Sequence, residues 1–409
     1  MSCEIKKLKE CCISIADGDH LPPPKSETGV PFVTIANVDS YNHFDFTDTM
    51  FVPQSYYDKL DNKRKARKGD ILLTVVGSFG IPILITNDTP FVFQRHIAIL
   101  RPNPLVIDSR FLYYTMLSKS FYAQADVYAV GAAQRTISLT SLRQMKIAVP
   151  TLDVQKKIAD AISSFDNLID NNNKKIQILE KIAENLYKEW FVRFRFPGYE
   201  NTEFENGIPK GWEYVKLGEK LRFERGVGYS SADLMDSHNV LLSMNNIRPW
   251  GGFIRDYSRK YSGKFKEFQV VKSNDLVMSI TDMTQDRRII GYVGLIPSSN
   301  QTRIICTHLM KVVALKNEYQ NTFLYGLFNF SGLSRCISER ATGANVLGLT
   351  ANILNNVKWY LPNVDLISEY CSIVNPLYEA IEQYENQNEN LIKQRDLLLP
   401  RLMSGKLEV

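Results

Sequence analysis

Two heptad repeats, one in the middle of the chain and one at its end, constrain the fold more than any other feature. Between 153 and 191 apolar residues recur in alternating steps of four and three, and only Asn172 interrupts them. Such a pattern predicts a long helix with one narrow apolar face, about 55 Å long, that needs a second helix beside it. The series consists of Ile158, Ile162, Phe165, Ile169, Ile176, Leu179, Ala183, Leu186 and Trp190.

The second repeat begins at 365 and supplies a partner for this helix. Tyr370 follows Ile158 by 212 residues (370 − 158), and Leu402 follows Trp190 by the same number (402 − 190). Two matched apolar faces in one chain predict an intramolecular helix pair rather than two solvent-exposed charged helices. The second series consists of Tyr370, Val374, Leu377, Ile381, Tyr384, Leu391, Leu398 and Leu402, with Asn388 and Arg395 as polar interruptions.

The sequence between the heptad repeats is duplicated as well. Gly131-Ala132 recurs as Gly343-Ala344, and Phe111-Leu112-Tyr113 recurs as Phe323-Leu324-Tyr325, both with the 212-residue offset. Upstream the offset drifts, as insertions in surface loops permit. Short apolar runs separated by Pro, Gly and Asn predict strands at 32–38, 71–76, 81–85 and 96–100, and helices at 108–124 and 319–339.

We therefore predict an α+β fold in which two tandem globular units of mixed α/β character alternate with two long helices. The helices pair as an intramolecular antiparallel coiled coil, and the duplication gives pseudo-twofold symmetry. The predicted boundaries are 1–150 for the first unit, 151–195 for the central helix, 196–362 for a linker with the second unit, and 363–409 for the last helix.

Composition and motifs argue against several functional classes. The sequence has no run of eighteen apolar residues, and its six cysteines form no CxxC, so we expect a cytoplasmic protein with reduced thiols and no metal site. It lacks GxxxxGK[ST], HExxH, GxSxG and the glycine-rich turn that binds S-adenosylmethionine. His96 and His308 occupy equivalent places in the two units, as satisfied core or groove histidines would. We predict no catalytic residues.

The distribution of cations suggests a polyanionic partner, although the net charge is only +5. Residues 63–68 place five cations in six positions before a predicted strand, and cations interleaved with aromatic residues occupy what we take as the corresponding region of the second unit. Cations, aromatics and amides in loops suit phosphate and base contacts, while an ordinary solvated face stays open as the alternative. The candidate DNA-binding residues are Lys63, Arg64, Lys65, Arg67, Lys68, Gly77, Ser78, Phe79, Gln134, Arg135, Arg255, Arg259, Lys260, Lys264, Arg287 and Arg288.

Three motifs resemble those of the specificity (S) subunits of type I restriction–modification systems. The segment 398–407, LLPRLMSGKL, is similar to the C-terminal signature of that family. The segment 187–198, YKEWFVRFRFPG, resembles its central conserved region, and 207–218, GIPKGWEYVKLG, resembles the start of its second recognition domain. The similarity in architecture covers the whole chain, but the chain lacks an IPxGW motif before its first unit.

The resemblance implies a function for each part. Two target recognition domains would each read one half of a bipartite, asymmetric site on double-stranded DNA, and the helix pair would set the spacer and dock two methyltransferase (M) subunits. Two restriction (R) subunits would complete the complex, and S-adenosylmethionine, ATP and magnesium would bind the partners. The alternative is a coiled-coil scaffold whose globular units bind proteins; the missing motifs disfavour a self-sufficient endonuclease or methyltransferase.

Overall fold

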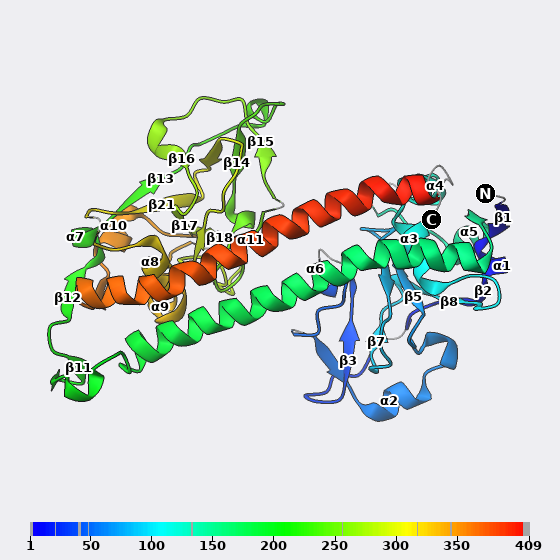
Figure 1. The fold of residues 1–409 in the computed structure, drawn as a ribbon, viewed down its shortest axis with the longest axis horizontal. Coiled ribbons are helices and arrows are strands. Elements are labelled where there is room, and N and C mark those ends of the chain that lie inside the picture. Colours follow the sequence, from blue (N-terminus) through cyan, green and yellow to red (C-terminus); the bar gives the residue numbers. More distant parts are fainter. Residues whose placement is uncertain are drawn as a thin grey trace. The chain divides into compact units, whose positions relative to one another are not determined.

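A computed structural model shows a chain of two compact units (Figure 1). The first comprises 1–171 with 387–409, and the second comprises 172–386. Both long helices contribute to both units: α6 spans Leu152–Tyr187, and α11 spans Val364–Met403. The described residues are 3–20, 22–39, 42–47, 49–131, 134–255, 257–316, 318–343 and 346–403.

The first unit is built around a four-stranded antiparallel sheet whose two faces are both covered. Because side chains alternate along a strand, Ile71 and Leu73 pack into one apolar cluster and Leu72 into another. The sheet has the order β2 (Cys12–Asp17), β8 (Ile97–Pro102), β5 (Ile71–Thr74) and β6 (Pro82–Leu84). A second sheet has the order β4 (Met50–Val52), β3 (Val30–Val33) and β7 (Val92–Phe93).

Short helices cover the first of these clusters. The predicted single helix at 108–124 is wrong, because Ser118 divides it into two. The backbone of Ser118 is extended at ψ 145°, and its hydroxyl accepts a hydrogen bond from Phe121 N at 3.3 Å. Ser118 therefore ends one helix and caps the next. The helices are α1 (Leu8–Cys11), α3 (Ser109–Leu117), α4 (Lys119–Tyr128) and α5 (Leu139–Gln144), and α2 (Gln54–Lys59) follows β4; β1 (Glu4–Lys7) pairs with β9 (Lys146–Val149).

The second unit repeats this strand order, which confirms the tandem duplication. Its main sheet has the order β13 (Leu221–Arg225), β21 (Leu309–Ala314), β17 (Leu276–Ser279) and β19 (Val293–Leu295). Its second sheet has the order β15 (Arg259–Lys260), β14 (Val240–Leu242), β20 (Arg303–Ile305) and β16 (Val270–Val271). The remaining pairs are β12 (Glu213–Lys216) with β23 (Lys358–Leu361), β18 (Thr281–Asp282) with β22 (Leu347–Gly348), and the linker hairpin β10 (Phe204–Glu205) with β11 (Ile208–Pro209).

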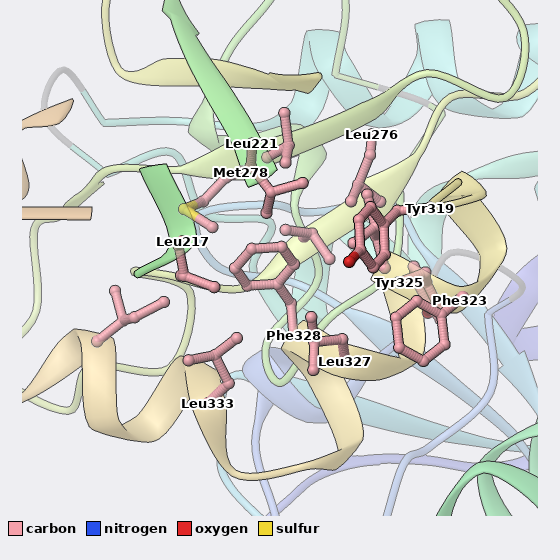
Figure 2. Packing of buried hydrophobic residues seen from close by; sticks show 14 of the residues in the cluster. Leu217, Leu221, Leu276, Met278, Tyr319, Phe323, Tyr325, Leu327, Phe328 and Leu333 are labelled. Atoms are coloured by element: carbon pink, nitrogen blue, oxygen red, sulfur yellow. The ribbon is translucent and has the colours of Figure 1, made fainter. Parts of the chain in front are cut away.

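The helices of the second unit pack on its main sheet. Figure 2 shows Phe328 and Leu327 of α8 (Asn321–Phe330) packing with Leu276 and Met278 of β17. The predicted helix at 319–339 is also two helices, because Gly332 adopts a φ of 88° between α8 and α9. The other helices of this unit are α9 (Leu333–Ser338), α7 (Leu217–Lys220) and α10 (Ala351–Asn355).

The two long helices pair within each unit. In the second unit the Tyr187 ring lies 5.8 Å from the Tyr370 ring, and Lys175 Nζ lies 4.9 Å from the Tyr384 ring. The later residue of α6 thus contacts the earlier residue of α11, and the earlier residue of α6 contacts the later one. The two helices therefore run antiparallel, as predicted. A π-helical turn at Lys188–Val192 follows α6 and carries Trp190, whose ring lies 5.9 Å from that of Tyr370.

In the first unit the helix pair merges with the globular core. Ile162 of α6 and Leu402 of α11 belong to the apolar cluster beneath the main sheet, and Arg395 Nη1 lies 2.8 Å from Asp166 Oδ1.

The two asparagines that interrupt the heptad series, Asn172 and Asn388, are both buried. Of the predicted packing residues, Ile158, Ile162, Ile169, Trp190, Val374, Ile381 and Leu402 are buried, and Phe165, Ile176, Leu179, Leu186, Leu377, Leu391 and Leu398 are half-buried.

Gly326 of α8 offers a test of this packing. A Cβ at this position would lie 2.2 Å from Cδ2 of Tyr187, whose side chain is almost fully buried. We expect Gly326→Ala to strain this contact by about 1–3 kcal/mol, more than the ~1 kcal/mol that alanine contributes as the better helix former. Urea unfolding should show the destabilisation. Gly228→Ala, where a Cβ meets no atom within 4 Å, should change stability by less than about 0.5 kcal/mol; equal effects would contradict the packing.

Candidate nucleic-acid interface

Two of the predicted contact segments meet in the first unit. The loop after β5 lies against a hairpin loop closed by Val130 and Thr136, whose backbones exchange hydrogen bonds of 3.0 and 2.8 Å. Gly77 N donates a hydrogen bond to Arg135 O at 2.9 Å. The structure thus brings together the segments 77–79 and 134–135, which lie more than fifty residues apart in the sequence.

The side chains of these loops divide into a buried support and an exposed tip. Phe79 is only 7% exposed; its ring stacks on Tyr122 at 5.8 Å, and the Arg135 guanidinium carbon lies 5.1 Å from the ring centre. Arg135 also forms an ion pair with Asp126. Phe79 and Arg135 therefore fix the loops, while Gly77, Ser78 and Gln134 are exposed.

The cationic segment 63–68 is held by a buried ion pair beneath it. Arg101 Nη2 lies 2.8 Å from Asp70 Oδ2 and donates a second hydrogen bond to Lys65 O at 2.9 Å. The neighbouring carboxylate raises the pKa of Arg101, although burial opposes this rise. Arg101 thus fixes the backbone that carries the cations.

The five cations of this segment differ in exposure. Arg64 lies 3.3 Å from Asp17, and Lys65 Nζ lies 5.1 Å from the centre of the Tyr57 ring. Both side chains are half-buried, whereas Lys63, Arg67 and Lys68 are exposed. The exposed three are the ones that can reach a phosphate.

A groove beside the segment brings in two cations that the sequence analysis missed. Lys9 and Arg143 line it together with Lys63 and Arg64. Arg143 belongs to α5 and donates a hydrogen bond to Ile15 O at 2.6 Å. The groove is formed by segments that lie far apart in the sequence, so no local charge pattern placed these two cations beside 63–68.

The second unit contains the same pair of loops. Thr342 and Gly348 exchange backbone hydrogen bonds of 3.2 and 2.9 Å, as Val130 and Thr136 do in the first unit, and β18 pairs with β22 beside them. Arg287 and Arg288 lie on the loop that follows β18. Arg287 Nη1 donates a hydrogen bond to Ser338 O at 3.0 Å, and Arg288 Nη2 lies 3.3 Å from Asp286 Oδ2.

The predicted correspondence between the two cationic regions is wrong. Arg259 and Lys260 form β15, which pairs with β14 as β4 pairs with β3, so they correspond to β4 and not to 63–68. Arg255 lies 2.7 Å from Glu385 Oε2 and donates a hydrogen bond to Asn386 Oδ1 at 2.7 Å, so it holds α11 against the second unit. Arg259, Lys260 and Lys264 are exposed.

The buried ion pair itself recurs in the second unit. Lys311 Nζ lies 2.7 Å from Asp275 Oδ2, where the first unit has Arg101 and Asp70. Each pair joins the residue before the central strand of the main sheet to the neighbouring strand, β8 or β21. Both loop regions are thus anchored in the same way.

The part of the chain that the structure describes supports neither a metal centre nor a reactive buried thiol. It contains no group of three His, Cys, Asp or Glu residues placed to hold a metal ion, and no helix there is long and apolar enough to span a membrane. Burial raises the pKa of Cys11 to about 11 and also raises the pKa of Cys12, Cys306 and Cys371. These thiols therefore remain protonated near neutral pH and are poor nucleophiles.

Comparison with known proteins indicates a family. Residues 3–181 match a family model described as the type I restriction modification DNA specificity domain. The MjaIX type I restriction enzyme specificity subunit of Methanocaldococcus jannaschii is 26% identical, over 99% of this chain and 94% of its own length. The HindI specificity subunit of Haemophilus influenzae is 21% identical over 84% of this chain and 88% of its own.

Residues 3–181 thus carry a type I restriction modification DNA specificity domain, and over its whole length the chain is similar to type I specificity subunits. The crystal structure of a type I restriction–modification S subunit from M. genitalium shares the fold, with a TM-score of 0.56 and 17% identity over 98% of this chain and 96% of that one. Of the three motifs behind the predicted resemblance, the C-terminal one lies at the end of α11, and its residues 404–407 fall outside the described residues.

The Arg101–Asp70 ion pair of the first unit can be tested directly. Arg101→Ala leaves the Asp70 carboxylate buried without its cation, so we expect the free energy of unfolding to fall by about 3–5 kcal/mol. Chemical denaturation would measure it. The control is Arg222→Ala, which removes an exposed arginine 2.7 Å from Glu224 and should change stability by less than about 1 kcal/mol. An effect at Arg101 no larger than the control's would contradict the anchoring role.

Proposed function

We propose that this chain is the non-catalytic DNA-specificity subunit of a type I restriction–modification complex. Each globular unit reads one half of a bipartite, asymmetric site on double-stranded DNA. The observation that carries the proposal is the recurrence of one loop arrangement with different side chains. The first unit has the exposed Ser78 and Gln134, and the second has the half-buried Arg287 and Arg288. Loops of one geometry with different hydrogen-bonding groups suit two different base sequences.

The helix pair sets the length of the unread spacer in this proposal. Support comes from the continuity of α6 and α11, each of which contributes residues to both units. Half-sites one helical turn apart are separated by about 34 Å. A helix pair of about 55 Å is long enough to span that separation.

Two methyltransferase (M) subunits dock on the chain. The tandem duplication offers two equivalent surfaces, as two copies of one partner require. Exposed apolar side chains on the long helices support such docking: Ile178 and Ile182 of α6 in the second unit, and Leu168 of α6 and Leu397 of α11 in the first. S-adenosylmethionine, ATP and magnesium then belong to the M subunits and to two restriction (R) subunits.

Binding of the chain–M complex to duplex DNA tests the proposal against the scaffold alternative. The helix pair suits either function, but exposed cations over a fixed backbone favour DNA. We expect sequence-specific binding that weakens as salt rises. Sequence-independent or undetectable binding, with protein partners retained on the globular units, would favour the scaffold.

Charge removal in the 63–68 segment tests whether it binds phosphates. In the same complex, the double variant Lys63→Gln, Lys68→Gln should bind all sequences more weakly. The slope of log K against log salt should become shallower by about 0.9 for each phosphate that the variant no longer neutralises. The charge-matched control Lys25→Gln, Lys146→Gln removes two exposed lysines outside this segment and should leave the slope unchanged. If the salt dependence had the same slope in both variants, residues 63–68 would be an ordinary solvent-exposed charged surface that does not bind phosphates.

Matched deletions test the spacer function. Removing one heptad from each long helix, 170–176 and 384–390, preserves the apolar register and shortens the pair by about 10 Å. This equals about 3 base pairs of DNA at a rise of ~3.4 Å. Methylation mapping should show both half-sites unchanged with the spacer shortened by that amount. An unchanged spacer would count against the helix pair as its determinant.

A further inference from the structure

One tryptophan of the second unit stands out by its exposure. Trp250 is 57% exposed, whereas Trp190 is buried and Trp212 and Trp359 are half-buried. It lies at the tip of a β-hairpin closed by the Ile247–Phe253 bridge. Its ring meets the Tyr292 ring edge-on at 5.6 Å, so one edge is supported while much of the ring faces solvent.

The backbone of Trp250 is held in an unfavourable conformation. Its φ is 67°, a value that a bulky side chain rarely adopts. The hairpin enforces it: Arg248 N donates a hydrogen bond to Gly252 O at 3.0 Å, and Gly252 N donates one to Val293 O at 2.9 Å. Glycine is needed at 251, where φ is 106° and a Cβ would lie 2.4 Å from Asn329 Cγ. Strain that the surrounding structure maintains is concentrated at functional sites.

The hairpin tip is joined to the loop that carries the predicted arginines. Trp250 N donates a hydrogen bond to Arg288 O at 2.8 Å, and Arg287 in this loop also has a positive φ, of 56°. The exposed Arg335 follows Ser334 in α9, whose hydroxyl donates a hydrogen bond at 2.6 Å to the carbonyl of Gly291, the residue before Tyr292. The segments that contact the hairpin tip and Tyr292 thus carry the cations Arg288 and Arg335.

We infer that Trp250 contacts duplex DNA in the half-site read by the second unit. The ring acts as an apolar wedge against a base step, while Arg288 and Arg335 reach the neighbouring phosphates. These cations favour a polyanion over an apolar protein surface. This inference rests on the proposed function and adds a contact that the candidate residues did not include.

The first unit has an aromatic residue at the matching place in its sequence. Its hairpin is closed by the Val38–Phe44 bridge, and both hairpins are seven residues long from one bridge residue to the other. The residue that corresponds to Trp250 is Tyr41, which falls outside the described residues. Both units therefore carry a large ring at this position of the chain.

Three variants, each in the complex with the M subunit, test the inference on a duplex containing the mapped site. Trp250→Asn removes the ring and suits a positive φ, so it should raise the melting temperature and weaken Kd roughly 5- to 100-fold, the effect of removing one base–aromatic stack. Trp250→Phe keeps a ring and should retain most of the affinity. Tyr214→Asn, at a ring of similar exposure on β12, should leave Kd within about twofold.

Tryptophan fluorescence gives an independent readout. DNA should protect the wild-type complex from acrylamide quenching, and the Trp250→Phe complex should show little of this protection. An unchanged Kd for Trp250→Asn overturns the inference. So does weakened assembly with the M subunit when the assembled complex binds DNA normally, because the ring would then bind protein. If the wild-type complex binds no DNA, the proposed function fails first and this inference fails with it.

Discussion

The pairing of α6 with α11 is the interaction on which the rest of the structure depends. Each helix contributes one segment to each unit, so neither globular core is complete without both of them. In the second unit Tyr187 and Tyr370 are buried side by side, and in the first unit Ile162 and Leu402 share the core beneath the sheet. Removal of either helix would therefore expose apolar surface in both units and not only along the coiled coil.

The two duplicated units share their framework and differ in loop-tip residues, as the proposed function requires. The strand order, the hairpin closures and the buried aspartate–cation pair recur, with Asp70 and Arg101 in the first unit and Asp275 and Lys311 in the second. Loop-tip residues such as Gln134 and Arg288 do not recur. A constant support with variable tips lets one fold read different sequences, because base contacts depend on side chains and the frame positions them.

The sequence predicted the long helices, their pairing and the duplication, because heptad periodicity and a fixed offset extend over many residues. The sequence-based prediction was wrong where the backbone conformation of a single residue ends a helix. Ser118 and Gly332 each divide a predicted helix through local backbone geometry. Sequence offset alone also matched Arg259 with the wrong region, since insertions shift the register that only strand pairing reveals.

The sequence indicated loop segments that the structure brings together, but it did not indicate which side chains in those segments are exposed. Phe79 and Arg135 belong to loops that the structure brings together, yet their side chains support those loops from within. Lys9 and Arg143 were missed because distant segments form the groove. The positive φ of Trp250 leaves no mark in composition or periodicity.

Mapping methylated bases in cells that carry the cognate M subunit, with and without this chain, tests the central claim most directly. Reading by two different units predicts a split, asymmetric motif with N6-methyladenine in both halves, which disappears when the chain is deleted. A methylation pattern that is the same with and without the chain would contradict the account.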